Sequence, residues 1–310
     1  MIISASYKTD IPAFYGDWFL NRLTAGFCRM VNPYGGQLHD IDLSPDAVDG
    51  FVFWTRNPGP FRGALSEVDR RGFPFVIQVT VTDYPRALDA ATIDADSAVE
   101  LIKALARDHG PAGVVWRYDP IVISDLTPAA WHEKNFARLA EALRGAVDEC
   151  VISFMQPYRK TRRNLDAAAR DHGFAWQDPQ DDDKQALLVT LAAIAADHGI
   201  AVTLCGQPDL IVDGVGEARC IDADRLARVA GRPLAGTAKP HRKTCRCDAS
   251  RDIGDYDSCP HGCAHCYAVQ SRDRAKRRFA AHDPTGEFLA PRDRSINEEP
   301  IIAGAAEPAG

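Results

Sequence analysis

The chain has 310 residues, of which 45% are hydrophobic, enough to bury the core of one large α/β domain or two small ones. A formal net charge of −7 gives no global electrostatic reason to bind nucleic acid or an anionic membrane. The start of the sequence lacks the basic and apolar regions of a signal peptide, and no apolar run is long enough to span a bilayer. We therefore expect a cytoplasmic protein that acts on a small-molecule substrate and has no membrane partner.

Short apolar runs alternate with helical patterns along the chain, which predicts βα units and a parallel sheet. Two helices are clearly delimited by capping residues and a following glycine, at Thr127–Leu143 and at about Asp181–His198. The predicted strands are Ile2–Ser6, Gly50–Trp54, Phe75–Thr82, Gly113–Tyr118, Cys150–Met155 and Ile200–Leu204.

The predicted fold class is α/β, a partial or complete TIM-like (β/α) barrel of about six βα units followed by a C-terminal cysteine-rich iron–sulfur segment. We expect the barrel domain to span residues 1–240 and the cysteine-rich segment, packed on the barrel mouth, to span 241–292. Residues 293–310, rich in Pro, Ala, Gly and Glu, are predicted to form a flexible tail.

Polar residues follow each predicted strand, and in a parallel barrel these positions face one mouth, where sites are built. The aspartates there could bind an amine or a ribose hydroxyl, and the arginines could clamp a carboxylate or phosphate. Alternatively, these charged residues pair with one another and have little binding role. The candidates are Asp10 and Asp119 for catalysis, and Arg56, Asn57, Arg117 and Lys160 for cofactor binding.

Five of the nine cysteines lie between residues 245 and 266, which indicates metal ligation rather than a disulfide scaffold. Cys259, Cys263 and Cys266 have C-x3-C-x2-C spacing, compact enough for one loop to wrap around a single cluster. Thiolates are the ligands that iron–sulfur clusters require. Three ligands leave one iron open to a substrate or cofactor, so we predict a [4Fe–4S] cluster with a catalytic role.

Four further thiols could supply the four ligands of a second metal centre, such as a second iron–sulfur cluster. A Cys-x-Cys pair in a polar, Arg-rich loop favours ligation, whereas the other two cysteines could equally be core residues. The four are Cys205, Cys220, Cys245 and Cys247, which leaves Cys28 and Cys150 as buried core cysteines.

Zinc is the rival metal. A tetrahedral structural zinc site would take Cys245, Cys247, Cys259 and either Cys263 or His261. The histidines inside the cysteine motif, His261 and His265, are expected to be exposed to solvent in a tight loop. The basic stretch Ser271–Phe279 could contact phosphates, but a solvated helix face is the simpler interpretation.

The cysteine motif resembles that of radical S-adenosylmethionine enzymes, and CPHGCAHCY is similar to their spore-photoproduct-lyase-like branch. The resemblance implies an open iron that chelates S-adenosylmethionine, reductive formation of a 5′-deoxyadenosyl radical, and an electron donor such as flavodoxin or ferredoxin. In that family, however, the motif follows the first barrel strand, whereas here it follows all six βα units. A GGE-like segment for the cofactor's amino group is not evident.

Four motifs, SASYKTDIPAFY, FWTRNP, WRYDPI and DIGDYDSCPHGCAHCYA, together resemble one bacterial family, domain of unknown function 1848. Tyr7 and Lys8 stand where that family usually has two arginines. The resemblance implies functional positions at Thr9, Asp10, Arg56, Asn57, Arg117, Asp119 and the seven cysteines named above as ligands.

These observations predict an iron–sulfur enzyme of radical S-adenosylmethionine type that acts on a small-molecule or nucleotide-like substrate. The first alternative is an iron–sulfur electron-transfer protein without S-adenosylmethionine chemistry. The second is a zinc-stabilised nucleic-acid-binding or interaction module.

Overall fold

The computed structural model describes residues 1–32, 35–239 and 244–290. The predicted tail at 293–310 lies outside these residues, as do residues 241–243, 291 and 292 of the predicted cysteine-rich segment. Within the described part of the chain, no helix combines the length and apolarity that crossing a membrane requires.

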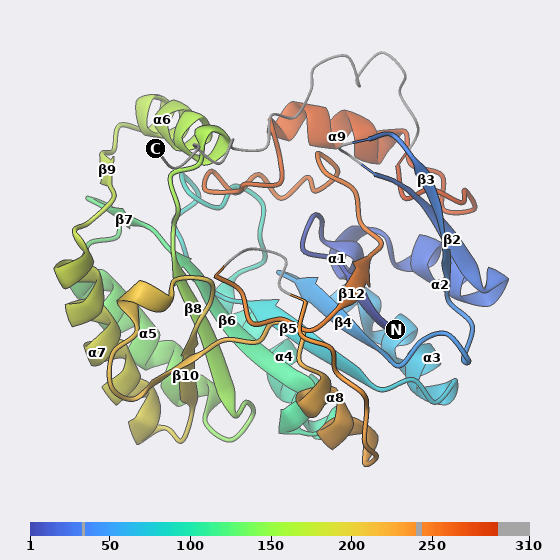
Figure 1. Cartoon of the computed structure of the whole chain (residues 1–310). Coiled ribbons are helices and arrows are strands. Elements are labelled where there is room, and N and C mark those ends of the chain that lie inside the picture. Colours follow the sequence, from blue (N-terminus) through green and yellow to red (C-terminus); the bar gives the residue numbers. More distant parts are fainter. Residues whose placement is uncertain (33–34, 240–243, 291–310) are drawn as a thin grey trace, which may run out of the picture.

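An eight-stranded sheet forms the centre of the molecule, and every neighbouring pair of its strands is parallel (Figure 1). All six predicted strands are present in it, which confirms the α/β fold class. In sheet order the strands are β11 (Val215–Glu217), β10 (Ala201–Leu204), β8 (Glu149–Phe154), β6 (Val114–Ile121), β5 (Phe75–Thr80), β4 (Gly50–Thr55), β1 (Ile2–Ala5) and β12 (Ser250–Asp252).

The two edge strands, β11 and β12, were not predicted. Each has three residues, and both carry polar or glycine residues instead of an apolar run. β12 belongs to the cysteine-rich segment and pairs with β1, so this segment contributes a strand to the central sheet. The described residues show no hydrogen-bonded pairing between β11 and β12, and closure of the sheet into a barrel therefore stays a prediction.

Side chains alternate between the two faces of the sheet, and both faces are buried, as expected for parallel strands. Ile3, Phe51 and Ile77 belong to the larger core, which includes the buried faces of the helices between the strands. Their neighbours Ile2 and Val52 belong to a second core on the opposite face.

The second core is covered by the chain between β11 and β12. Ile221, Leu226 and Cys247 are buried there against the strand residues. The C-terminal third of the chain thus supplies both edge strands and the segment that covers the second core.

Nine α-helices are described, and α5 and α7 pack together beside the sheet while α6 and α9 lie on one side of it (Figure 1). Their bounds are α1 (Ile11–Phe14), α2 (Gly16–Ala25), α3 (Arg62–Arg70), α4 (Ala95–His109), α5 (Ala129–Leu143), α6 (Arg159–His172), α7 (Asp181–Asp197), α8 (Ala223–Ala230) and α9 (Arg272–Ala280). Asn164 of α6 donates a hydrogen bond to the Val269 carbonyl, just before α9.

Short elements complete the fold. Two antiparallel pairs join β2 (Phe27–Val31) to β3 (Leu38–Asp42) and β7 (Ile123–Ser124) to β9 (Trp176–Gln177). Single 3₁₀ turns lie at Gly59–Phe61, Pro111–Gly113 and Pro208–Leu210.

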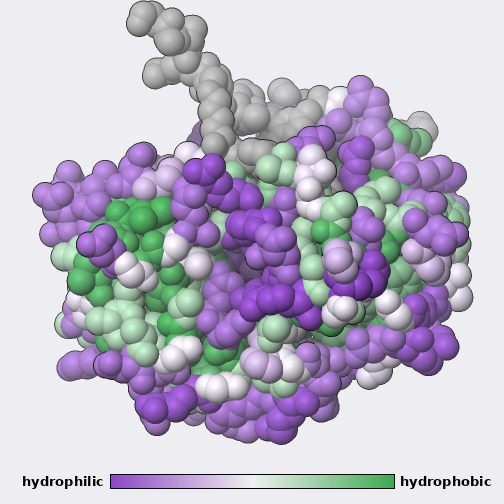
Figure 2. Space-filling view, turned by 60° about the horizontal axis from the view of Figure 1, so that its bottom comes forward, coloured by the Kyte–Doolittle hydropathy of each residue, from purple (hydrophilic) through white to green (hydrophobic). Residues whose placement is uncertain are grey.

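The two clearly predicted helices are present with small differences at their ends. α5 begins after Pro128, because the predicted capping residue Thr127 instead directs its hydroxyl to the Val122 carbonyl at 2.7 Å. α7 begins with three aspartates, which its N-terminal dipole favours. Figure 2 shows a mainly hydrophilic surface with a hydrophobic area at the left, the side on which α5 and α7 lie, and Val189 of α7 is half exposed.

A buried histidine on α5 makes the stability of the fold sensitive to pH. His132 is fully buried between the Tyr118 hydroxyl, 2.9 Å from its Nδ1, and the Val122 carbonyl, 3.0 Å from its Nε2. Burial lowers the pKa of His132 to about 4. Below about pH 6.5 the unfolded chain therefore takes up a proton that the folded chain does not bind.

We expect the free energy of unfolding to fall by on the order of 3 kcal/mol as the pH drops from about 6.5 to about 4 because of His132 alone. His132→Gln should remove most of that dependence, although it lowers stability at pH 7. Urea unfolding of both proteins at pH 7 and pH 4.5 measures the difference. An identical loss of stability in both proteins would contradict this role.

Candidate metal centres

The cysteine loop is tied to the end of β1 by one buried carboxylate. Asp252, the last residue of β12, accepts hydrogen bonds from the hydroxyls of Ser4 at 2.5 Å and Ser6 at 2.8 Å. It also accepts from the Tyr7 amide and pairs with the Lys8 ammonium at 3.5 Å. These contacts fix where the chain leaves the sheet before it reaches the first cysteine.

Gly254, two residues later, is required by close packing. A Cβ at this position would lie 2.0 Å from the Ser6 Oγ and 2.5 Å from its Cβ. We therefore expect Gly254→Ala to displace the loop and to lower the free energy of unfolding by about 1–3 kcal/mol, which chemical denaturation measures. The control is Gly63→Ala on α3, where no atom lies within 4 Å. Equal stability of the two variants would argue against this close contact.

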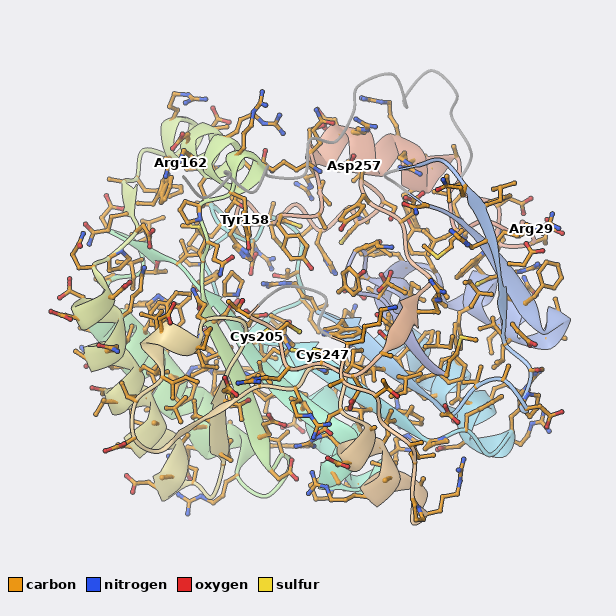
Figure 3. The ribbon with its side chains drawn as sticks, in the orientation of Figure 1. Arg29, Tyr158, Arg162, Cys205, Cys247 and Asp257 are labelled. Carbon is orange, nitrogen blue, oxygen red and sulfur yellow. The ribbon has the colours of Figure 1, made fainter. Side chains whose placement is uncertain are left out.

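The loop itself is closed at its base by Asp257, which lies beside α9 in Figure 3. The Asp257 amide donates to the Ala268 carbonyl at 3.1 Å, and its carboxylate accepts from the Gln270 amide. Further along, the Ala264 amide donates to the Leu88 carbonyl at 2.8 Å, which anchors the loop to the segment after β5. The cysteine motif is therefore held between the ends of β1 and β5.

The three thiols of this loop lie near one another. Burial raises the pKa of Cys263, and the charges of Cys266 and Cys259 raise it further. Burial likewise raises the pKa of Cys259, with Asp10 and Cys266 as smaller causes. Thiols of this kind are protonated until a metal displaces the protons, so this half-buried group can hold a metal. The set Cys259, Cys263 and Cys266 is called the three-thiol group below.

The two histidines of the motif are buried, and the prediction that they are exposed is wrong. The His261 Nε2 lies 2.8 Å from the Asp10 carboxylate, and the His265 Nε2 lies 3.1 Å from the Asp89 carboxylate. The loop turns inward because these carboxylates, which come from distant parts of the sequence, pair with its imidazoles. Both histidines therefore position the loop that carries the thiols.

Asp89 was not among the predicted residues, and no local pattern marks it. Its carboxylate is buried between His265 and the Arg56 guanidinium, to which it forms an ion pair. Despite its burial, Arg56 and His265 hold the pKa of Asp89 below its usual range. In the described part of the chain, the ligand atoms of Asp89, Cys263 and His265 are the one set of three lying within 4.8 Å of one another.

The predicted binding residues near this group are already engaged. Arg56 is paired with Asp89, and the Asp10 carboxylate accepts from the Arg56 and Ala13 amides. The Asn57 side chain accepts from the Gly59 amide at 3.1 Å and so shapes the turn after β4. Lys160 differs, because its ammonium lies 5.6 Å from the ring centre of Tyr256, and its charge partly opposes the rise that burial causes in the pKa of Cys266.

The other predicted pair, Arg117 and Asp119, forms an ion pair at 2.6 Å. Ser153 donates to the same aspartate, and Gln78 accepts from the arginine. Arg56 and Arg117 each form an ion pair with a nearby aspartate. These contacts agree with the alternative expectation that charged residues at the strand ends pair with one another. Arg117 also donates a hydrogen bond to the sulfur of Cys220 at 3.2 Å.

A second group of thiols is centred on Cys220. Its sulfur lies 3.4 Å from that of Cys205 and interacts with Cys247, whose amide donates a hydrogen bond to the Cys245 sulfur at 3.4 Å. Figure 3 shows Cys205 and Cys247 close together near the middle of the molecule. This four-thiol group, Cys205, Cys220, Cys245 and Cys247, brings together the four residues predicted for a second centre.

The remaining cysteines lie in the core. Cys28 and Cys150 are fully buried in the larger hydrophobic cluster, as expected. None of the nine thiols, all of which are among the described residues, forms a disulfide. The rival zinc set drew on both loops, whereas the structure places Cys247 beside Cys220 and Cys245.

The family assignment follows from a match that extends from the first strand through the cysteine motif. A family model described as domain of unknown function (DUF1848) matches residues 2–268. The chain belongs to the DUF1848 family. The matched region contains both thiol groups and the ion pairs beside them. No curated protein and no solved structure matches the chain. Family membership therefore agrees with the sequence motifs but assigns no reaction.

Proposed function

We propose that this DUF1848 protein is an iron–sulfur enzyme of radical S-adenosylmethionine type, with a [4Fe–4S] cluster on Cys259, Cys263 and Cys266. The observation that carries the proposal is the gathering of three half-buried thiols on one loop at the carboxyl end of a parallel sheet. Ligands bind at this end of α/β sheets. The substrate would be a small molecule or a nucleotide-like compound.

The residues around the three-thiol group fit such a cofactor. Each thiol can serve one iron, and the buried histidines hold the backbone between them. The buried Thr9 hydroxyl, next to Asp10 in the sequence, has no hydrogen-bond partner among the described residues. When bound, a cluster with one open iron would supply one-electron reduction and a site for the amino and carboxylate groups of S-adenosylmethionine.

The charges of the chain divide into structural and binding roles. The Arg56 guanidinium neutralises Asp89 and favours the thiolate form of Cys263. Lys160 forms no ion pair within the described residues and lies beside Cys266, so we assign it to the cofactor's carboxylate or to a substrate anion. This assignment leaves Asp10 as a positioning residue for His261, since its carboxylate is occupied by that imidazole and two amides.

An external electron donor such as flavodoxin or ferredoxin is part of the proposal. The basic residues of α9 and of α6, which lie on the same side of the sheet as the cysteine loop, would suit an acidic donor of that kind (Figure 1).

The test is reductive cleavage of S-adenosylmethionine by anaerobically purified, iron-loaded protein with dithionite, read out as 5′-deoxyadenosine. Wild type and Cys28→Ala should form it, and Cys266→Ala should not. Lys160→Ala should retain iron but bind S-adenosylmethionine more weakly. An iron-loaded wild type that neither binds nor cleaves S-adenosylmethionine would replace this proposal with an electron-transfer role.

A further inference from the structure

We infer that Cys205, Cys220, Cys245 and Cys247 form a second, separate site that binds a single tetrahedral zinc ion. Four cysteines from three separate segments of the chain meet here and form no disulfide among the described residues. Shared ligation of a metal would explain why the fold brings them together. The Cys220 sulfur lies 3.4 Å from the Cys205 sulfur and interacts with Cys247, and the Cys247 amide donates to the Cys245 sulfur.

The separation of the Cys205 and Cys220 sulfurs favours two ligands on one shared metal ion over ligands on two different irons of a four-iron cluster. Four thiolates at about 2.3 Å from a tetrahedral zinc lie about 3.8 Å from each other. The 3.4 Å separation of the Cys205 and Cys220 sulfurs is close to that value. In a four-iron cluster each thiolate ligates a different iron, which requires a wider separation.

The three-thiol group differs in this respect. No sulfur–sulfur hydrogen bond joins its members in the described contacts, although their charges act on one another. In neither group do three sulfurs lie within 4.8 Å of one another among the described residues, but the four-thiol group contains a pair of sulfurs 3.4 Å apart, a contact that the described contacts of the three-thiol group lack. Different metals are the simplest physical reason for that difference.

Hydrogen-bond donors around the four-thiol group suit thiolate ligands. The Arg117 guanidinium donates to the Cys220 sulfur at 3.2 Å, and Gln78 and Asp119 hold the guanidinium in place. The Ile221 amide donates to the Cys247 sulfur at 3.4 Å. A zinc ion with four thiolates has two net negative charges, which such donors offset. This gives Arg117 a role in tuning the metal site instead of clamping a substrate.

The position of the group explains what zinc would do for the fold. Cys205 follows β10, Cys220 follows β11, and Cys247 lies three residues before β12. The chain between the two edge strands is already linked by the Asp248 amide, which donates to the Ile221 carbonyl at 3.0 Å. A zinc ion here would fasten one edge of the sheet to the segment that leads into the other.

The zinc site does not depend on the proposed function, and its test separates the two. Metal analysis of the purified full chain should find about one zinc per chain. Replacing all three of Cys259, Cys263 and Cys266 by Ala should remove iron and leave zinc. Cys220→Ser should lose zinc, and Cys28→Ala should keep it.

Cobalt(II) exchange into the wild-type protein keeps the test decisive if Cys220→Ser does not fold. Cobalt bound by four thiolates in a tetrahedral site should give strong sulfur-to-cobalt charge-transfer absorption and intense visible bands. Three results would overturn the inference: a wild-type protein that takes up neither zinc nor cobalt, zinc lost with the three-thiol group, or iron and sulfide lost on replacing Cys220.

Discussion

Arg56→Leu is expected to lower the free energy of unfolding by about 3–5 kcal/mol, because it leaves the Asp89 carboxylate buried without its guanidinium partner. Asp89 is almost completely buried, and of its polar partners His265 and the Thr82 hydroxyl would remain beside it. The same change should also loosen the cysteine loop, since His265 depends on that carboxylate. Urea denaturation of the metal-free protein measures the stability effect without contributions from metal binding.

Two further variants distinguish an unpaired charge from a general loss of packing. The double variant Arg56→Leu/Asp89→Leu removes both charges and should recover most of the stability. Arg138→Leu is the matched surface control, because Arg138 is 44% exposed and its ion pairs with Asp83 and Asp96 should contribute less than about 1 kcal/mol. A double variant no more stable than Arg56→Leu would show that the pair's charge is not the cause.

Cys263→Ala is expected to reduce bound iron from about four atoms per chain to nearly none. Cys263 is the central thiol of its group and lies beside the Arg56–Asp89 pair, so no neighbouring sulfur can take its place. Iron and acid-labile sulfide, measured after anaerobic reconstitution, report the loss. The expected zinc content is unchanged, since Cys263 is not part of the four-thiol group.

The matched control for that experiment is Cys28→Ala, which removes a fully buried core thiol that belongs to neither group. It should keep all the iron at a modest cost in stability. Full iron content in Cys263→Ala would exclude Cys263 as a ligand. Equal iron loss in Cys28→Ala would mean that the iron is bound nonspecifically.

The sequence predicted the central strands well because each is a short apolar run buried on both faces. Gly50–Trp54 and Cys150–Met155 differ by one residue or so from the observed β4 and β8. β11 and β12 were missed because neither has an apolar pattern, and the position of β12 depends on its pairing with β1, which lies far away in the sequence. Local patterns carry no information about such pairings.

The division of the cysteines into candidate ligands and core residues was also predictable, since the spacing of the cysteines and the polarity of the surrounding sequence indicate it. What the sequence did not predict is which distant groups meet them. The exposure predicted for His261 and His265 was wrong because the two carboxylates that bury them, on Asp10 and Asp89, lie more than 170 residues away in the chain. The compact sulfur contacts of Cys220 likewise come only from the folded arrangement.

The two thiol groups occupy different structural settings. The three-thiol group is carried by one loop, is surrounded by buried charges and has Lys160 beside it. The four-thiol group is assembled from loops that follow β10 and β11 and precede β12, where a bound metal would stabilise the second core. This division favours a reactive centre in the first and a structural centre in the second.

Counting iron, sulfide and zinc in the same anaerobically purified, reconstituted wild-type sample tests this division most directly. We predict about four iron, about four sulfide and about one zinc per chain. A colourless protein that contains zinc but takes up no iron or sulfide would contradict the account.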